Sequence, residues 1–242
     1  MEKYFSQIYY ESFAKEVKET NRYIHSNLSE KFILEFKKYI YSKKIIIERN
    51  TSFYRAQIGC DFYDAILSGS STKQKLPKAY LESRLRPLRD SAREGRLNPK
   101  GISYMYLSNM KKTAIAETRP WIFDIVSVGV FENINELNLV TFDPIKNSNN
   151  GKSWKDKIDF DEYESQILTY AFSRPVNNNE KSCDYAPTQI LSEVIKNEGF
   201  DGIEYQSVLS SGINYVIFDQ DKMVFRNSDF SIIKSINTDI YE

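Results

Sequence analysis

Arginine is concentrated in one stretch of this 242-residue sequence. Between residues 84 and 100 stand six cationic side chains: Arg84, Arg86, Arg89, Arg93, Arg96 and Lys100. Only Asp90 and Glu94 oppose them there, which leaves an excess of four positive charges. Guanidinium groups bind phosphate oxygens through paired hydrogen bonds. The stretch is therefore a candidate pyrophosphate site, and a solvated basic loop is the alternative that composition alone leaves open.

Histidine and cysteine are too scarce for several common kinds of active site. His25 is the only histidine, so Ser-His-Asp triads, Cys-His pairs and His-rich metal sites would all depend on one position. Cys60 and Cys183 are far apart and suit a reducing compartment rather than a disulfide framework or a zinc site. No Walker loop or GxGxxG motif is present. We expect no bound metal, and arginine remains the means of binding phosphate.

Six short motifs stand in a fixed order along the chain. They are Tyr54-Arg55, GRLNPKG at 95–101, YMYLS at 104–108, TAIAE at 113–117, YQS at 205–207 and GIN at 212–214. Together they resemble the RES domain family, named for an arginine, a glutamate and a serine. The resemblance spans roughly residues 50–228 and leaves residues 1–48 outside.

The resemblance implies an ADP-ribosyltransferase-like fold and an enzyme that cleaves NAD+ at its nicotinamide glycosidic bond. Members of the family are commonly the toxin of a bacterial toxin–antitoxin pair. They destroy NAD+ by phosphorolysis or hydrolysis, or they transfer ADP-ribose to a protein. NAD+ is then a substrate rather than a recycled cofactor, and inorganic phosphate is a candidate co-substrate.

The family's functional residues carry over to six positions of this sequence. They are Arg55, Arg96, Tyr106, Glu117, Ser207 and Asn214. The resemblance assigns catalysis to Glu117, Arg55 and Ser207, and NAD+ binding to Arg55, Arg96, Tyr106, Ser207 and Asn214. The family often has an aromatic residue where Leu97 stands, so a stacking contact is in question there while the charges are retained.

The chemistry of NAD+ cleavage fits a chain that is poor in histidine. Nicotinamide leaves as a neutral base, so bond breaking needs neither a general acid nor a metal. Positive charge develops on the ribose in an oxocarbenium-like transition state, and a fixed carboxylate stabilises it. Glu117 is the candidate for this role. Arg55 and Arg96 would hold the pyrophosphate, and Tyr106 would offer either its ring to nicotinamide or its hydroxyl to a phosphate.

Each of these residues also has an ordinary structural interpretation. A glutamate at a helix end, such as Glu117, is usually solvated or paired with a cation. Tyr106 alternates with Tyr104 in an apolar strand, where packed aromatics are common. Ser207 would also suit the start of a turn, and Ser210 and Ser211 compete for its role.

Three functions follow from these alternatives. The first is an NAD+-degrading enzyme that uses phosphate or water as the acceptor. The second is a protein mono-ADP-ribosyltransferase that uses the same NAD+ site. The third is a catalytically silent binding module, which the intact set of Arg55, Arg96, Glu117 and Ser207 disfavours.

The elements that must position these residues belong to an α+β fold. Residues 1–48 have a helical pattern and form an N-terminal extension, and residues 49–242 form the catalytic domain. Further helices are expected at 109–117, 160–172 and from Pro187 to Gly199. Strands are expected at 53–58, 103–108, 124–132, 202–207, 213–218 and 223–227. The resemblance implies that they form a mixed or split sheet with flanking helices.

Charge and hydropathy constrain the partners. The sequence has 33 basic and 33 acidic residues, which disfavours a general nucleic-acid or anionic-membrane binder. No run of about 20 apolar residues and no signal peptide is evident, so we expect a cytoplasmic protein. By analogy with the family, its partner would be an antitoxin with a DNA-binding domain. Self-association of the extension remains open.

Overall fold

The computed structural model describes residues 7–66, 72–89, 91–142, 160–174 and 182–236. A mixed eight-stranded sheet forms its centre, and every neighbouring pair is antiparallel except β7 and β8. The strand order is β1 (Lys44–Ile47), β7 (Leu137–Thr141), β8 (Gly202–Gln206), β9 (Ile213–Ile217), β5 (Met105–Ser108), β2 (Ser52–Ile58), β6 (Ile125–Asn133) and β10 (Met223–Ile232).

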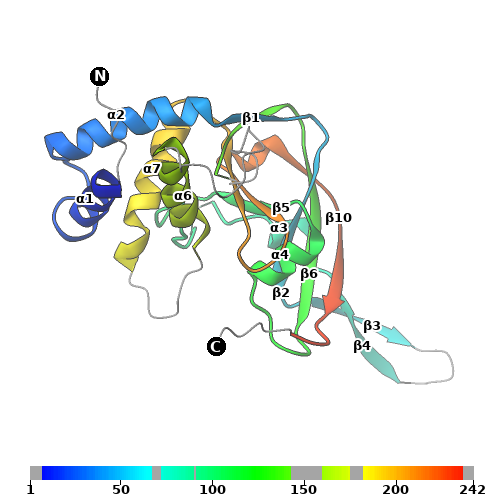
Figure 1. The fold of residues 1–242 in the computed structure, drawn as a ribbon. Helices are drawn as coiled ribbons and strands as arrows, with labels where there is room; N and C mark the ends of the chain where they lie inside the picture. The colour runs from blue at the N-terminus through cyan, green and yellow to red at the C-terminus, as the bar shows by residue number, and fades with distance from the viewer. Residues whose placement is uncertain (1–6, 67–71, 90, 143–159, 175–181, 237–242) are drawn as a thin grey trace, which may run out of the picture.

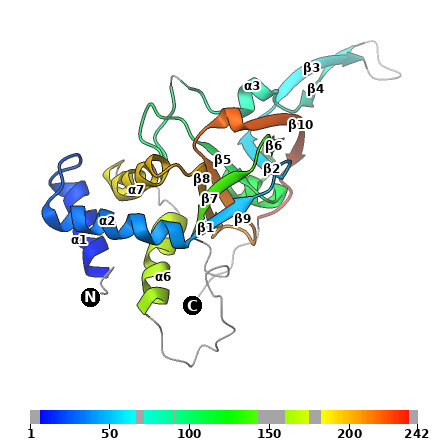
Figure 2. The same cartoon turned by 90° about the horizontal axis from the view of Figure 1, so that it is seen from above.

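Four helices gather beside the β1 end of this sheet (Figure 1; Figure 2). They are α1 (Gln7–Glu19), α2 (Asn27–Ser42), α6 (Phe160–Ser173) and α7 (Ala186–Asn197). The other described helical elements are two short helices, α3 (Glu82–Leu85) and α4 (Lys111–Glu117), and the 3-10 turns η1 (Ser182–Tyr185) and η2 (Gln220–Lys222). A mixed sheet with flanking helices confirms the α+β prediction.

The N-terminal helices share a hydrophobic core with the rest of the chain. Phe13 of α1 and Phe36 of α2 are fully buried in one cluster that also contains Phe172 of α6 and Ile195 of α7. Lys37 reinforces this packing through an ion pair with Glu198, just beyond α7, at 2.8 Å. The division of the chain at residue 48 stays a prediction, while the packing of α1 and α2 against α7 is observed.

The positions of a proline and a glycine in the sequence predict the two ends of α7 closely. Pro187 stands in the first turn of α7, where its missing N–H costs no hydrogen bond. Gly199 follows the helix with a φ of 86°, a left-handed conformation that suits glycine. The expected helices at 109–117 and 160–172 correspond to α4 and α6.

The expectation of helix throughout residues 1–48 is wrong at Lys44–Ile47, which form β1. Three consecutive isoleucines favour extended backbone, and pairing with β7 satisfies the hydrogen bonds of this segment. The strands β3 (Asp61–Ile66), β4 (Lys73–Lys78) and β7 were also absent from the prediction. Charged and polar residues in β3 and β4 obscure the period-two pattern.

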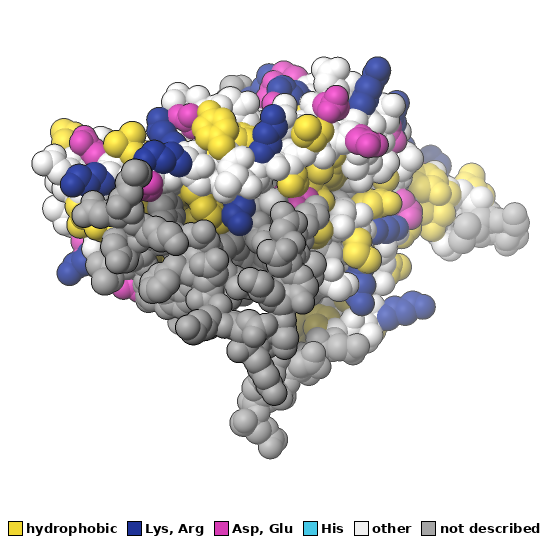
Figure 3. Space-filling model, turned by 45° about the horizontal axis from the view of Figure 1, so that its top comes forward, with side chains coloured by type: hydrophobic (Ala, Val, Ile, Leu, Met, Phe, Trp, Pro, Cys, Tyr) yellow, Lys and Arg dark blue, Asp and Glu magenta, His cyan; other side chains and the backbone are white. Residues whose placement is uncertain are grey.

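Strands β3 and β4 form a separate hairpin that projects from the body (Figure 1; Figure 2). Ser127 of β6 binds the backbone at both ends of this hairpin, just before β3 and just after β4. Its hydroxyl donates to the Gly59 carbonyl at 2.8 Å and accepts from the Tyr80 N–H at 3.0 Å. On the main body, Lys and Arg side chains are interspersed with Asp and Glu, in keeping with the balanced composition (Figure 3).

Alternation along the central strands assigns their side chains to two faces. Met105 and Leu107 of β5 belong to a second hydrophobic cluster, whereas Tyr104 packs in the cluster beneath the helices. Tyr106 and Ser108 therefore share the face of Tyr104. None of the described helices is both long and apolar enough to cross a lipid bilayer.

We predict that Phe36→Ala lowers the free energy of unfolding of the whole protein by about 3–5 kcal/mol, because it leaves a cavity in the shared core. Chemical denaturation followed by circular dichroism measures this change. Leu34→Ala, on an exposed position of the same helix, is the matched control. Separate unfolding of α1 and α2 with an unchanged main transition would contradict the prediction.

Candidate active site

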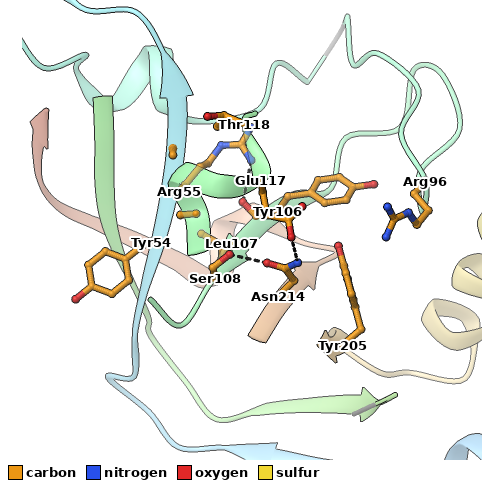
Figure 4. A pocket seen from close by; sticks show the side chains of 12 residues that line it. Tyr54, Arg55, Arg96, Tyr106, Leu107, Ser108, Glu117, Thr118, Tyr205 and Asn214 are labelled. Atoms are coloured by element: carbon orange, nitrogen blue, oxygen red, sulfur yellow. Dashed lines mark hydrogen bonds between the residues drawn. The ribbon is translucent and has the colours of Figure 1, made fainter. Parts of the chain in front are cut away.

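Four strands bring polar side chains into one row across the sheet. In the strand register, Ser108 of β5 lies opposite Tyr54 of β2 on one side and Asn214 of β9 on the other. Asn214 in turn lies opposite Tyr205 of β8. Directly opposed residues point to the same face, so Ser108, Asn214 and Tyr205 meet at the floor of a cavity of about 260 Å³ (Figure 4).

Arg55 bridges the place where β2 and β5 part. The two strands pair at a single position, Tyr54 opposite Ser108, and beyond it the Arg55 side chain crosses the gap. Its Nε donates to the Leu85 carbonyl at 2.6 Å, and its Nη1 donates to the Tyr106 carbonyl at 2.9 Å. Burial lowers the pKa of Arg55 to about 10, so the group is still cationic at neutral pH. Its neighbours are carbonyl dipoles, and no described carboxylate forms an ion pair with it.

Arg96 approaches the cavity from the opposite side (Figure 4). Its Nη1 donates to the Phe172 carbonyl near the end of α6 at 2.7 Å, and its guanidinium carbon lies 5.9 Å from the centre of the Tyr205 ring. Thr188 of α7 fixes the backbone by donating to the Arg96 carbonyl at 2.7 Å. Within the described residues Arg96 also has no carboxylate partner, so two cations face the same space with donors available for an anion.

Glu117 is oriented by two neutral donors. As the last residue of α4, it presents Oε1 to the Ser207 hydroxyl at 2.7 Å and to Nδ2 of Asn214 at 2.6 Å. Asn214 is itself oriented, because its Oδ1 accepts from the Ser108 hydroxyl at 2.7 Å. The other carboxylate oxygen, Oε2, accepts no hydrogen bond from the described residues. Glu117 lines the cavity, so this oxygen is available to a ligand.

The hydroxyl of Ser207 is committed to Glu117. Ser207 follows β8 directly, and its Oγ accepts from the Leu209 N–H at 3.2 Å while its proton points to Glu117. The competing Ser210 instead accepts from the Thr113 hydroxyl at 3.0 Å. Ser207 is therefore the serine that positions the carboxylate.

Tyr106 holds the loop that carries Arg96. Its hydroxyl donates to Oδ1 of Asn98 at 2.8 Å and accepts from the Leu97 N–H at 3.1 Å. A Cβ on Gly95 would stand 2.6 Å from that Asn98 oxygen, so a side chain at this position would displace a neighbouring side chain. Because the hydroxyl proton is used within the protein, the ring is the part of Tyr106 that remains available in the cavity. Of the two roles left open for Tyr106, this geometry favours the ring.

The structure brings all six predicted site residues together. Five of them, Arg55, Arg96, Tyr106, Glu117 and Asn214, line the cavity, and Ser207 binds the Glu117 carboxylate behind it. Their roles in catalysis and binding stay predictions.

Sequence reasoning did not assign roles to Ser108, Asn98 or Tyr205. Ser108 could have been found by alternation, since it stands two residues after Tyr106 in a strand. Asn98 is part of the quoted GRLN motif, but nothing in the sequence shows that its partner is the Tyr106 hydroxyl. Tyr205 precedes Ser207 by two positions, and its side chain reaches the cavity only because β8 lies beside β9.

Comparisons with known proteins give a family model and similar solved structures. The sequence model of the RES domain matches residues 75–234, a range that includes every predicted site residue except Arg55. A chain from the crystal structure of the M. tuberculosis MbcT–MbcA toxin–antitoxin complex is similar over 82% of this chain and 92% of its own length. The two are 10% identical, with a TM-score of 0.42. No curated protein matches the chain.

The burial of Tyr106 should make the free energy of unfolding decrease at alkaline pH. Burial is the main cause that raises its pKa from 10.0 to about 12, so the folded state keeps a proton that the unfolded state releases. The contribution is fully present below pH 10 and is lost as the pH rises toward 12. Between pH 9 and 11 we expect the wild-type unfolding free energy to fall by about 1 kcal/mol more than that of Tyr106→Phe. Parallel urea titrations measure the difference, and equal slopes against pH would contradict it.

Proposed function

The chain belongs to the RES domain family, and we propose that it is an NAD+-degrading enzyme that cleaves the bond between nicotinamide and ribose. The observation that supports this function most directly is the carboxylate of Glu117. One oxygen is fixed by Ser207 and Asn214, and the other is open to a cavity flanked by Arg55 and Arg96. A fixed anion between two cations matches a substrate that has an anionic pyrophosphate and develops positive charge on its sugar.

In the proposed mechanism, the protein contributes orientation and electrostatics. Arg55 and Arg96 bind the pyrophosphate through guanidinium donors that their carbonyl contacts leave available. The bond from C1′ to the pyridinium nitrogen breaks, and its electron pair neutralises the departing nicotinamide. The positive charge that remains on the ribose lies beside Glu117, whose anion stabilises it.

The acceptor completes the reaction by attacking C1′. Attack by a phosphate oxygen yields ADP-ribose that carries the new phosphate at C1′. Attack by water yields ADP-ribose and releases a proton. Ser207 acts as a positioning residue in either case, because its hydroxyl proton is directed at Glu117 and its oxygen at Leu209. Ser207 and Asn214 together keep the Glu117 carboxylate from rotating away from the sugar.

Glu117→Gln is predicted to lower kcat for nicotinamide release by about 100- to 1,000-fold with little change in KM, because shape is kept and charge is lost. Chromatography of nicotinamide from purified protein and NAD+ measures this. Glu136→Gln, on an exposed turn, is the matched control. Normal turnover in Glu117→Gln would refute the role of the carboxylate. Mass analysis of the product with and without phosphate identifies the acceptor.

One observation favours a protein mono-ADP-ribosyltransferase as the second candidate. The loop after Glu117 exposes Trp121 and Phe123, at 74% and 80% of their full accessible surface. Both Arg119 and Phe123 have a positive φ, which is strained for bulky residues. The loop is nevertheless fixed, since the Trp121 N–H donates to Asp124 at 2.7 Å and the Phe123 N–H donates to Ile233 at 2.8 Å. Fixed, exposed aromatic residues are typical contacts for another protein.

If the acceptor is a protein, replacing Trp121 and Phe123 by serine should abolish transfer of labelled ADP-ribose to protein and leave nicotinamide release intact. The measurement uses NAD+ labelled in its adenosine and a cell extract as the source of acceptor. Wild-type protein that releases nicotinamide without labelling any protein would exclude the transferase.

In the cell, we propose that the enzyme is the toxin of a toxin–antitoxin or defence system, held inactive by an antitoxin with a DNA-binding domain. The support is the family and the consequence of unrestrained NAD+ loss for growth. Expression of the wild-type chain should arrest growth and lower cellular NAD+, whereas expression of Glu117→Gln should do neither.

A further inference from the structure

A second cavity lies next to the candidate active site and shares Arg55 and Tyr106 with it. Its volume is about 630 Å³, against about 260 Å³ for the first. Three more arginines line it: Arg84, Arg86 and Arg93. The other described polar residues in its lining are neutral or aromatic, and none is a carboxylate. The four arginines supply more positive charge than a pyrophosphate alone needs, so the cavity should attract a further anionic group.

The three additional arginines differ in how far the protein already uses them. Arg86 uses all three of its guanidinium nitrogens within the protein: Nε donates to Glu82 at 2.7 Å, Nη1 to the Gln220 carbonyl at 2.9 Å and Nη2 to the Met223 carbonyl at 2.7 Å. It serves as a structural support and as fixed charge.

Arg84 and Arg93 have guanidinium donors to spare. Arg84 lies over the Tyr80 ring, with its guanidinium carbon 4.6 Å from the ring centre, and forms no ion pair with the described residues. Stacking restricts its orientation while its hydrogen-bond donors stay available. Arg93 contributes its backbone carbonyl to Asn98 at 2.9 Å, and its side chain is exposed and likewise without an ion pair in the described part of the chain.

Size and connectivity indicate what reaches this space. Enclosed sites for small organic ligands measure about 300–1,000 Å³, so the first cavity alone is small for a dinucleotide. Arg55 lines both cavities, and a pyrophosphate bound to it would let the nicotinamide riboside occupy the first and the adenosine enter the second. This step rests on the proposed function.

The charge of the second cavity then selects between two adenosines. A carboxylate that accepts from the ribose 2′-hydroxyl favours NAD+, whereas an arginine accommodates a 2′-phosphate. The described lining has free arginines and lacks a carboxylate. We infer that the second cavity binds the 2′-phosphate of an adenosine ribose, so that NADP+ is a better substrate than NAD+ and Arg84 and Arg93 determine the preference.

The test compares kcat/KM for NADP+ and NAD+ by nicotinamide release in phosphate-free buffer. We expect a higher value for NADP+ in the wild type. Arg84→Gln and Arg93→Gln should each lower the NADP+ value about tenfold, because each variant loses one charge-assisted hydrogen bond. The NAD+ value should stay nearly unchanged in both. Arg89→Gln is the matched control, because Arg89 belongs to the same stretch but pairs with Asp221 and does not line the cavity. Equal use of both dinucleotides, or equal losses for both in the two variants, would overturn the inference.

A free phosphate ion is the other source of the same chemistry, and a binding experiment distinguishes it. Calorimetry with adenosine 2′,5′-bisphosphate, ADP and inorganic phosphate should give the tightest binding for the bisphosphate, weakened in Arg84→Gln and Arg93→Gln. Binding of inorganic phosphate that depends on these arginines, without a gain for the bisphosphate over ADP, would overturn the inference. If neither dinucleotide is cleaved, the proposed function fails, but tight binding of the bisphosphate would still support the second cavity as a 2′-phosphate site.

Discussion

The guanidinium of Arg55 occupies the gap between β2 and β5, and the arrangement of the site depends on it. It donates to a carbonyl of β5 and to one at the end of α3, so one side chain links three segments that are distant in sequence. A cation in this place gives a hydrogen-bond donor to one strand carbonyl and one helix carbonyl where the two strands diverge. It also retains its positive charge without a carboxylate partner among the described residues. Structural support and the proposed anion binding would thus come from the same group.

The strand register explains how the remaining groups meet. Ser108, Asn214 and Glu117 form a chain of hydrogen bonds in which each member orients the next, and Ser207 closes it from the end of β8. A shift of β9 by one residue would turn Asn214 to the opposite face and remove one of the two donors to Glu117. The geometry of the carboxylate is therefore set by the sheet as much as by α4.

The sequence allows prediction of those parts of the site that follow local patterns. The helix that ends at Glu117, the strand with Tyr106 and the GRLN loop each have a motif, and family resemblance indicates that they act together. Alternation also explains why Tyr106 and Ser108 share a face. The carbonyl partners of Arg55 and Arg96 could not be predicted, because they belong to Leu85, Tyr106 and Phe172 through backbone atoms that carry no residue identity. The strand β1 was missed because tertiary pairing with β7 decides between helix and strand for so short a segment.

The β3–β4 hairpin is bound to the main sheet at its two ends. Ser127 contacts both ends, and the Ser228 hydroxyl donates to the Tyr80 carbonyl at 2.8 Å. Its strands hydrogen-bond with each other and with no strand of the main sheet, and they expose Phe62, Tyr63 and Ile66 to solvent. An isolated two-stranded ribbon has little stability of its own in water. Local opening of this ribbon should therefore be uncoupled from global unfolding, so that its amides exchange and proteases cleave there while the cavity of the candidate active site remains assembled.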